Sequence, residues 1–268
     1  MTLTQLFGKN YKWWYIVWFS ISRESVGFKG FLVYQFSNIT RILTTVYIWY
    51  LANADSSTIS YLLLGQIYKS IAENIYYFRL SDLIYSGAIS SDLLNPKPFI
   101  FTQFVKSIGA RIVKNFYFVL GAIIGVLIAS FTFASVQLSI ENIYLLIIMI
   151  PISFFLNFIL GALVGCIAFF VKDRRDYEGY RNSYEAIIFA ITGITIPLYK
   201  FPLWLFKSLE LLPTAWIVHH PMQIYLGKYD TNQTILVFLG GLSWCLVLYI
   251  LAKIVFKMGL KRNESVGL

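Results

Sequence analysis

Charge is scarce in this sequence, and the scarcity excludes an ordinary soluble domain. Charged residues make up 13% of the 268 residues and apolar residues 58%, whereas soluble domains carry about 25% charged residues. Several apolar runs approach or exceed the roughly 20 residues that cross a bilayer. Since the strands of membrane barrels alternate in hydrophobicity and rarely contain such runs, the composition predicts an all-α polytopic membrane protein.

Residues typical of catalytic and metal sites are also few. The two cysteines, Cys166 and Cys245, lie within apolar runs, which favours buried small hydrophobes over a disulfide or a metal pair. His219 and His220 are adjacent, and no Cys or carboxylate stands at a ligand spacing from them, so we expect no metal site. The sequence contains neither a phosphate-binding loop nor a nucleophile-elbow serine. We therefore expect a protein that is not an enzyme and does not hydrolyse ATP by itself.

The basic residues are unevenly distributed along the chain. They gather before the first apolar run, after the second and fourth runs, and at the end of the sequence, while residues 52–58 and 132–142 contain none. Because cytoplasmic loops retain Lys and Arg, this pattern predicts that both termini are cytoplasmic. The net charge of +9 is then explained by contacts with anionic lipid rather than with nucleic acid.

The apolar runs predict six membrane spans that form one domain over residues 31–268. Residues 1–30 are rich in Trp and Tyr with interspersed cations, but their apolar core is too short to cross a bilayer. For this segment we expect an interfacial amphipathic helix on the cytoplasmic side. The expected spans are residues 31–51, 59–77, 112–133, 143–171, 186–198 and 235–256.

Prolines interrupt the chain before the last expected span. Pro202, Pro213 and Pro221 divide residues 199–225 into short pieces. A seventh crossing here would place the C-terminal cations outside, so we expect short re-entrant helices in the outer leaflet. Their irregular backbone must be covered by protein or water, so these pieces should pack on neighbouring helices.

Three ionisable residues fall inside the first two expected spans. Arg41 lies in the middle of the first, and Lys69 and Glu73 lie four residues apart on one face of the second. A charge near the bilayer centre costs about 2.5–3.5 kcal/mol on insertion scales, so three of them need a reason. They either line a polar substrate path or form a structural ion-pair cluster, and the sequence supports both interpretations equally.

Two further patterns concern contacts. The small-residue motifs Gly121-x-x-x-Gly125 and Gly161-x-x-x-Gly165 allow close helix approach, which we expect within the chain rather than between subunits. The densely charged residues 172–181 are typical of a solvated cytoplasmic turn. A second interpretation is a docking surface for a cytoplasmic partner.

The segment after the second expected span is more strongly patterned than a tether. Leu80, Leu83, Ile84 and Gly87 recur at helical spacing, and the prolines at residues 96 and 98 end any helix that follows. This pattern predicts an amphipathic segment that lies along the membrane surface and offers one face to another protein.

Two stretches resemble the permeases of type-2 ATP-binding cassette (ABC) exporters, in particular the small permeases whose ATPase is a separate polypeptide. Residues 84–96, I-Y-S-G-A-I followed by D-L-L-N-P, resemble the family segment I-x-S-G-x-[IL]…L-L-x-P. Residues 212–227, L-P then H-P and I-Y-L-G, resemble the family segment L-P…P-x-x-[IL]-x-L-G. The resemblance covers essentially the whole chain.

The resemblance implies a permease subunit in a bacterial cytoplasmic membrane, working with a second permease that is identical or homologous. Two copies of an ABC ATP-binding subunit would hold ATP and Mg, and this chain would hold no cofactor. Each permease would contact its ATP-binding subunit through a coupling segment, with the re-entrant helices closing the exit. Carried over, the coupling segment contains Gly87, Ile89, Asp92, Leu93, Leu94 and Pro96.

Within the coupling segment, residue chemistry suggests separate roles. Ile89, Leu93 and Leu94 would supply an apolar anchor buried in the partner, and Asp92 and Lys97 a polar rim. The alternative from another class is an ion-coupled secondary transporter, or a channel, that acts without an ATPase. Its coupling groups would be the three intramembrane charges, but no inverted repeat supports it. A membrane-embedded enzyme would need a catalytic constellation that the sequence does not contain.

Overall fold

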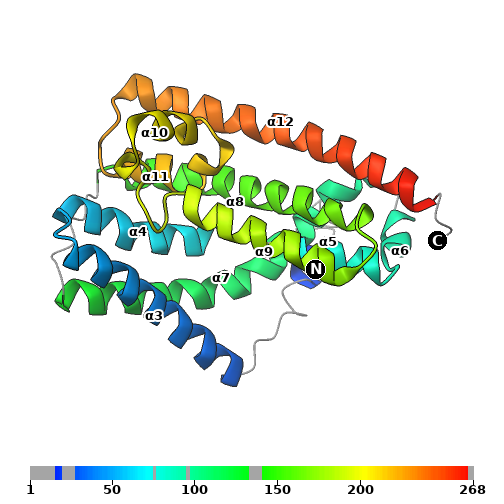
Figure 1. The fold of residues 1–268 in the computed structure, drawn as a ribbon, viewed down its shortest axis with the longest axis horizontal. Helices are drawn as coiled ribbons and strands as arrows, with labels where there is room; N and C mark the ends of the chain where they lie inside the picture. The colour runs from blue at the N-terminus through cyan, green and yellow to red at the C-terminus, as the bar shows by residue number, and fades with distance from the viewer. Residues whose placement is uncertain (1–15, 20–27, 75–76, 95–96, 133–140, 265–268) are drawn as a thin grey trace, which may run out of the picture.

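The computed structural model describes residues 16–19, 28–74, 77–94, 97–132 and 141–264, and all the regular structure in these ranges is helical (Figure 1). The prediction of an all-α protein is therefore confirmed. Residues 16–19 are helical, but most of the expected interfacial helix lies outside the described residues. The elements are α3 (Phe28–Leu51), α4 (Ser56–Ala72), α5 (Tyr77–Tyr85), α6 (Ile89–Leu93), α7 (Phe99–Thr132), α8 (Ile143–Cys166), η2 (Ile167–Phe169), α9 (Arg174–Ile191), η3 (Leu198–Lys200), α10 (Leu203–Glu210), η4 (Pro213–Trp216), α11 (His219–Tyr225) and α12 (Thr231–Glu264).

Three helical stretches in the described part of the chain are long and apolar enough to cross a membrane. They are α7, α8 continued by η2, and α12 up to Arg262. The sixth expected span lies wholly within α12, and the third and fourth end one and two residues beyond the first two stretches. Helix α3 contains the first expected span and begins three residues before it. The second and fifth expected spans differ from the structure.

The second expected span, residues 59–77, is not one helix. Helix α4 begins at Ser56, where the Asp55 side chain caps it by accepting from the Thr58 backbone amide, and it ends at Ala72. Glu73 leaves the helical region, with φ −69° and ψ 125°, and α5 begins at Tyr77. The chain is thus interrupted near the middle of the bundle, and polar side chains from neighbouring helices satisfy the freed carbonyls, as described below.

The fifth expected span, residues 186–198, is misplaced. Helix α9 begins at Arg174, where Oδ1 of Asp173 accepts from the Arg175 amide at 2.8 Å. Ion pairs at i,i+4 spacing, Arg174–Glu178 and Arg181–Glu185, run along it and favour the helical state. The charged residues 174–181 are therefore helical and not a turn. The helix ends at Ile191, shortly before Gly193, which has a positive φ of 84°.

Small residues allow the helices to approach closely. A Cβ added at Gly125 of α7 would lie 3.1 Å from Cδ1 of Ile42 on α3, and one at Gly165 of α8 would lie 2.9 Å from Cβ of Leu80 on α5. Both small-residue motifs thus make contacts within the chain, as expected. Cys166 is buried, Cys245 is half-buried, and both are free thiols.

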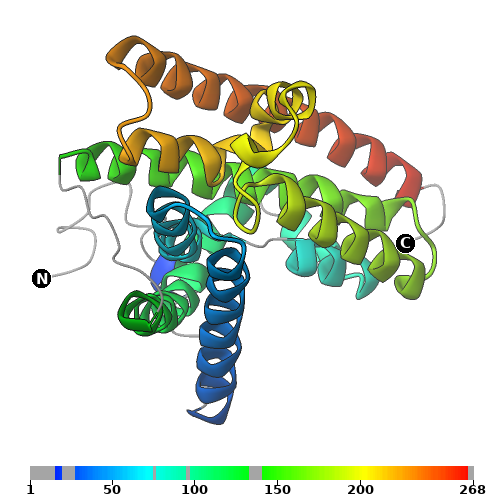
Figure 2. The ribbon, with the colours of Figure 1, turned by 60° about the vertical axis from the view of Figure 1, so that its left-hand side comes forward.

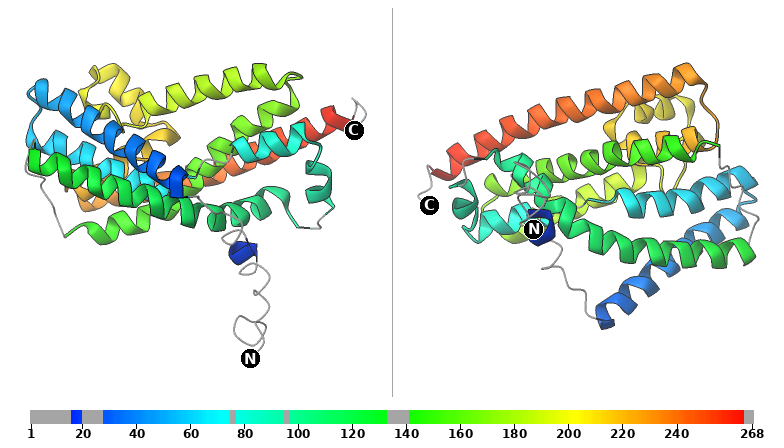
Figure 3. Two further views of the ribbon diagram at one scale, coloured as in Figure 1. Left: turned by 90° about the horizontal axis from the view of Figure 1, so that it is seen from below. Right: turned by 180° about the vertical axis from the view of Figure 1, so that it is seen from behind.

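The elements form an elongated bundle whose two ends differ. Helix α6 and the last turns of α12 lie at one end, and α10, α11 and the first turns of α12 lie at the other (Figures 1 and 3). The first turns of α3 project from the bundle (Figure 2), and Val33 and Phe36 there are exposed. The two candidate functional regions are located at the two ends.

Candidate functional site

The coupling segment forms a sharp corner between α5 and α7. Gly87 adopts a positive φ of 71°, a conformation that favours glycine, and the chain then turns into the short helix α6. Side-chain hydroxyls secure the corner: Oγ of Ser86 donates to the Asp82 carbonyl at 2.6 Å, and Oγ of Ser90 donates to the Gly87 carbonyl at 2.8 Å. Leu80, Leu83 and Ile84 are all buried, so the apolar residues at helical spacing in α5 face their own chain.

The apolar residues of the coupling segment face in different directions. Ile89 is only 4% exposed and packs in the core of its own chain, so it secures the segment to the helical bundle and does not present an outward anchor. Leu93 is 39% exposed and Leu94 is 87% exposed, so these two form the apolar surface of the corner. Pro96 lies outside the described residues.

Asp92 secures the coupling segment to α7. Its Oδ1 accepts from Nζ of Lys106 at 2.9 Å and its Oδ2 accepts from Nε2 of Gln103 at 2.6 Å. Burial alone would raise the pKa of the Asp92 carboxyl, but the bonds from Lys106 and Gln103 outweigh it, and its pKa lies below its usual range. The carboxylate is therefore charged at neutral pH, and α6 and α7 are mechanically connected.

The start of α9 lies beside the same corner. Arg174 pairs with Asp82 of α5 at 2.9 Å, and the Tyr85 hydroxyl donates to the Val171 carbonyl at 3.1 Å. The charged residues of α9 therefore adjoin the coupling segment, although 92 residues separate Arg174 from Asp82. This adjacency is what a second docking surface would require.

The three intramembrane charges are brought together between α3 and α4. Lys69 and Glu73 form an i,i+4 ion pair at 3.5 Å, and Glu73 also attracts Arg41 electrostatically. Arg41 donates to Oδ1 of Asn38 at 2.7 Å. The sequence reasoning missed the contribution of α9: Lys69 feels the charge of Glu185 and lies 5.8 Å from the Phe189 ring centroid.

Two asparagines donate hydrogen bonds to the backbone carbonyls that the interruption between α4 and α5 leaves without helical partners. Nδ2 of Asn115 on α7 donates to the carbonyls of Ile71 and Glu73 at 2.9 and 2.8 Å. Nδ2 of Asn157 on α8 donates to the Ala72 carbonyl at 3.1 Å. The last carbonyls of α4 are thus paired by side chains from two other helices, which is how broken helices persist away from water.

At the opposite end, the three prolines delimit short helices as expected. Pro202 directly precedes α10, Pro213 begins η4, and Pro221 lies in the first turn of α11. All of residues 214–225 are buried, which agrees with the expected packing on neighbours. Trp216 is central to this packing, since its Nε1 donates to the Val237 carbonyl at 2.7 Å and its ring covers the two glycines at residues 240 and 241 of α12.

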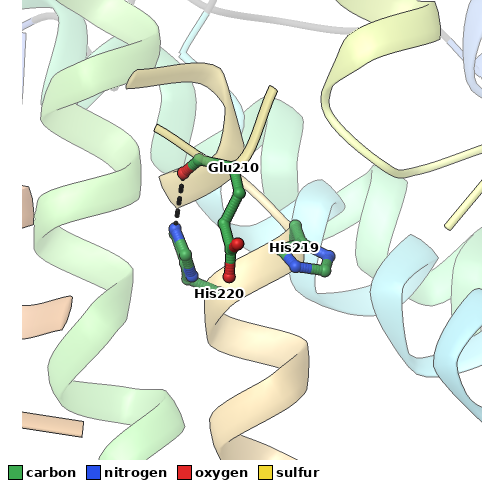
Figure 4. Close-up of side chains that lie close together, drawn as sticks. All are labelled: Glu210, His219 and His220. Atoms are coloured by element: carbon green, nitrogen blue, oxygen red, sulfur yellow. Dashed lines mark hydrogen bonds between the residues drawn. The ribbon is translucent and has the colours of Figure 1, made fainter. Parts of the chain in front are cut away.

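The same region contains a cluster that the sequence analysis did not predict. Glu210, at the end of α10, and His219 and His220, at the start of α11, place one potential ligand atom each within 4.8 Å of one another (Figure 4). Sequence spacing failed here because the turn through η4 brings Glu210 back beside histidines that follow it by nine and ten residues. The fold therefore brings a carboxylate close to both histidines, which the spacing along the sequence did not indicate.

A cavity of about 300 Å³ opens beside this cluster, with Tyr199, Glu210, His219, Gln223, Lys228 and Tyr229 among its lining residues. Both imidazoles are neutral at physiological pH. Burial, assisted by neighbouring His220, lowers the pKa of His219 to about 3, and burial lowers the pKa of His220 to about 4. Among the described residues, neither ring nitrogen of His219 has a hydrogen-bond partner.

A helical bundle with three helices able to cross a bilayer, polar groups paired between its helices and a surface helix at one end is typical of a multi-pass membrane transport protein. Comparison with known families gives the particular assignment. The chain belongs to the family described as ABC-2 family transporter protein, whose model matches residues 15–267. It is therefore an ABC transporter permease. A search of curated proteins finds no significant match.

Proposed function

We propose that this chain is the permease subunit of an ATP-driven exporter in a bacterial cytoplasmic membrane. Its six spans would be α3, the broken pair α4–α5, α7, α8 with η2, α9 and α12, with both termini in the cytoplasm. Helices α10 and α11 would be the outer re-entrant pair that closes the exit. The family assignment supports this arrangement over an ion-coupled transporter or channel.

A second permease, identical or homologous, would complete the translocation path, and two ATP-binding subunits would supply ATP and Mg. The observation that carries the proposal is the surface of the coupling segment. Leu94 is 87% exposed beside Ile89, which is 4% exposed. A helix held firmly from one side and apolar on the other is suited to insert into a protein socket.

The polar contacts of Asp92 explain how such a contact could move the permease. Because Asp92 joins α6 to Lys106 and Gln103 of α7, a displacement of α6 would be transmitted to a helix of 34 residues. The role of Asp92 in this proposal is therefore to position the coupling segment, and the outward anchors are Leu93 and Leu94. Residues 174–181 would widen the docking surface.

The test is co-purification of the full-length permease with an ATP-binding subunit encoded by a neighbouring gene. Fully burying a leucine contributes about 1.5–3 kcal/mol, which corresponds to roughly a tenfold to hundredfold change in affinity. Leu94→Arg should lower the affinity for the ATP-binding subunit by at least that factor, because it also places a charge in the apolar socket. Since Leu94 is exposed, membrane insertion and yield should stay at the wild-type level.

The matched control is Leu211→Arg, because Leu211 is also an exposed leucine, at 70%, and follows α10 at the opposite end of the bundle. This control should retain the ATP-binding subunit. Normal complex formation by Leu94→Arg would refute the assignment of the docking surface. Transport by the purified permease alone, without any ATP-binding subunit, would refute the exporter proposal itself.

A further inference from the structure

The cluster at Glu210, His219 and His220 has more hydrogen-bond acceptors than donors. The Glu210 backbone carbonyl can only accept, so Nε2 of His220, 3.0 Å away, carries that ring's proton. Nδ1 of His220 is therefore left with a lone pair, and it faces the Tyr229 hydroxyl at 2.9 Å. The tautomer of His220 is thus determined by the backbone.

Tyr229 cannot satisfy the acceptors around it. Its hydroxyl carries one proton, but it lies 2.9 Å from Nδ1 of His220 and 3.4 Å from Oε1 of Glu210. The His219 ring lies close to the same cluster, is 1% exposed, and has neither nitrogen hydrogen-bonded within the described part of the chain. A buried polar group without a partner costs free energy comparable to a lost hydrogen bond. The cluster therefore offers more nitrogen and oxygen lone pairs than the described donors around it can satisfy.

We propose that Glu210, His219 and His220 bind one divalent transition-metal ion, and that zinc is the ion they suit best. Two imidazoles and one carboxylate form the three-residue donor set of open zinc sites, with metal–ligand distances of about 2.0–2.2 Å. Ligand atoms of a tetrahedral zinc lie roughly 3.3 Å apart by these distances. Because the three donor atoms already lie within 4.8 Å of one another, small side-chain adjustments would complete the site.

The surrounding hydrogen bonds have the arrangement expected around a metal-binding histidine. Such a histidine generally donates its other ring N–H to a carboxylate or a backbone carbonyl, which fixes its orientation. Nε2 of His220 already makes this bond to the Glu210 carbonyl. Binding would require Nδ1 to exchange the Tyr229 hydroxyl for the ion. The adjoining cavity gives room for water at the fourth position and a route of entry.

A bound ion would join the end of α10 to the start of α11. Eight residues, 211–218, separate these helices. The ion would hold the two ends of this connection together, because its ligands lie at residues 210, 219 and 220. Zinc would thereby stabilise the outer hairpin, which the proposed function places at the exit. The metal site itself rests on the local geometry and not on the transport assignment, so the two proposals can fail separately.

The test uses the full-length protein purified without a polyhistidine tag and treated with a chelator. Zinc chloride is titrated against a chromophoric chelator, and we expect one zinc ion per chain. Glu210→Gln and His219→Gln should each weaken binding at least about tenfold, because losing a direct ligand costs no less than losing one of its hydrogen-bond partners, which costs about 10–100-fold. Co²⁺ added alone should give visible absorption bands that are absent in both variants.

Two further variants keep the result interpretable. Tyr229→Phe retains all three ligands and removes the hydroxyl that occupies Nδ1, so it should bind zinc at least as tightly as the wild type. Asp176→Asn removes an exposed carboxylate in the first turn of α9, beside the coupling segment at the opposite end of the bundle, and should leave binding unchanged. Helix content and elution volume confirm that each variant is folded. Absence of stoichiometric zinc in the wild type, or equal affinity in folded Glu210→Gln and His219→Gln, would overturn the proposal.

Discussion

Asn115 donates two of the three side-chain hydrogen bonds at the interruption between α4 and α5, so its replacement should have a measurable cost. Asn115 on α7 is buried, with 7% of its surface exposed. Its Nδ2 donates to the carbonyls of Ile71 and Glu73 at 2.9 and 2.8 Å. Replacement of Asn115 by Leu removes both bonds while retaining similar volume. The two carbonyls would then lose their side-chain donor at a position away from solvent.

The magnitude follows from the two lost bonds. Interhelical hydrogen bonds in membrane proteins average about 0.6 kcal/mol each and reach about 1.7 kcal/mol. The pair should therefore contribute roughly 1–3 kcal/mol. For a chain of 268 residues, a change of 1 kcal/mol shifts the unfolding temperature by about 2–4 °C. Asn115→Leu should thus lower the midpoint by roughly 3–10 °C.

The assay is the loss of the monodisperse elution peak after heating purified protein in detergent. Asn115→Asp provides a second variant of nearly identical shape, and its carboxylate faces the two carbonyls without a donor, so it should lower the midpoint at least as much. Asn232→Leu, at an exposed position in α12, is the matched control. A midpoint for Asn115→Leu equal to that of the control would refute the role assigned to these bonds.

Two further predictions concern packing and charge. Gly165→Ala would place a Cβ 2.9 Å from Cβ of Leu80 and should destabilise the protein by about 1–3 kcal/mol through overpacking. The control Gly179→Ala, with no atom within 4 Å of the added Cβ, should not destabilise it. Comparison of the thermal midpoints of the two variants tests this expectation. Because Lys69 and Glu73 pair at 3.5 Å, Lys69→Gln or Glu73→Gln should lower membrane protein levels. The exchanged pair Lys69→Glu/Glu73→Lys should restore them only in part, because it places a lysine near Arg41 and a glutamate near Glu185. Normal protein levels with lost transport would instead identify a substrate path.

Sequence patterns predicted the elements whose signal is local. Helices α7, α8 and α12 are apolar over more than a bilayer thickness, so hydropathy alone locates them. The interruption after Ala72 was not predicted, because apolar residues continue on both sides of it. Its cause lies in Asn115 and Asn157, whose bonds to α4 join residues 44 and 85 positions apart. A span-length pattern contains no information about such partners.

The start of helix α9 was mispredicted for a different reason. Its sequence contains local helix signals, but the dense charge indicated a loop. Asp173 stands at the capping position, and Arg174–Glu178 and Arg181–Glu185 have the spacing of helical ion pairs. A density of charge in a membrane protein favours a loop interpretation. Capping and i,i+4 spacing are the better indicators here, because they depend on backbone geometry and not on where the helix lies.

The coupling segment and the His–Glu cluster show what sequence reasoning can and cannot give for a site. The pattern around residues 80–98 predicted a short amphipathic segment ended by prolines, since both features follow from helical periodicity and proline positions. It did not separate Ile89 from Leu94, because the direction of each side chain depends on the turn at Gly87 and on the ion pair between Lys106 and Asp92. The cluster depends on a turn of eight residues that no periodicity describes. In both places the chemistry is decided by how a short connection folds back, and the residues that control the fold-back are the ones to vary first.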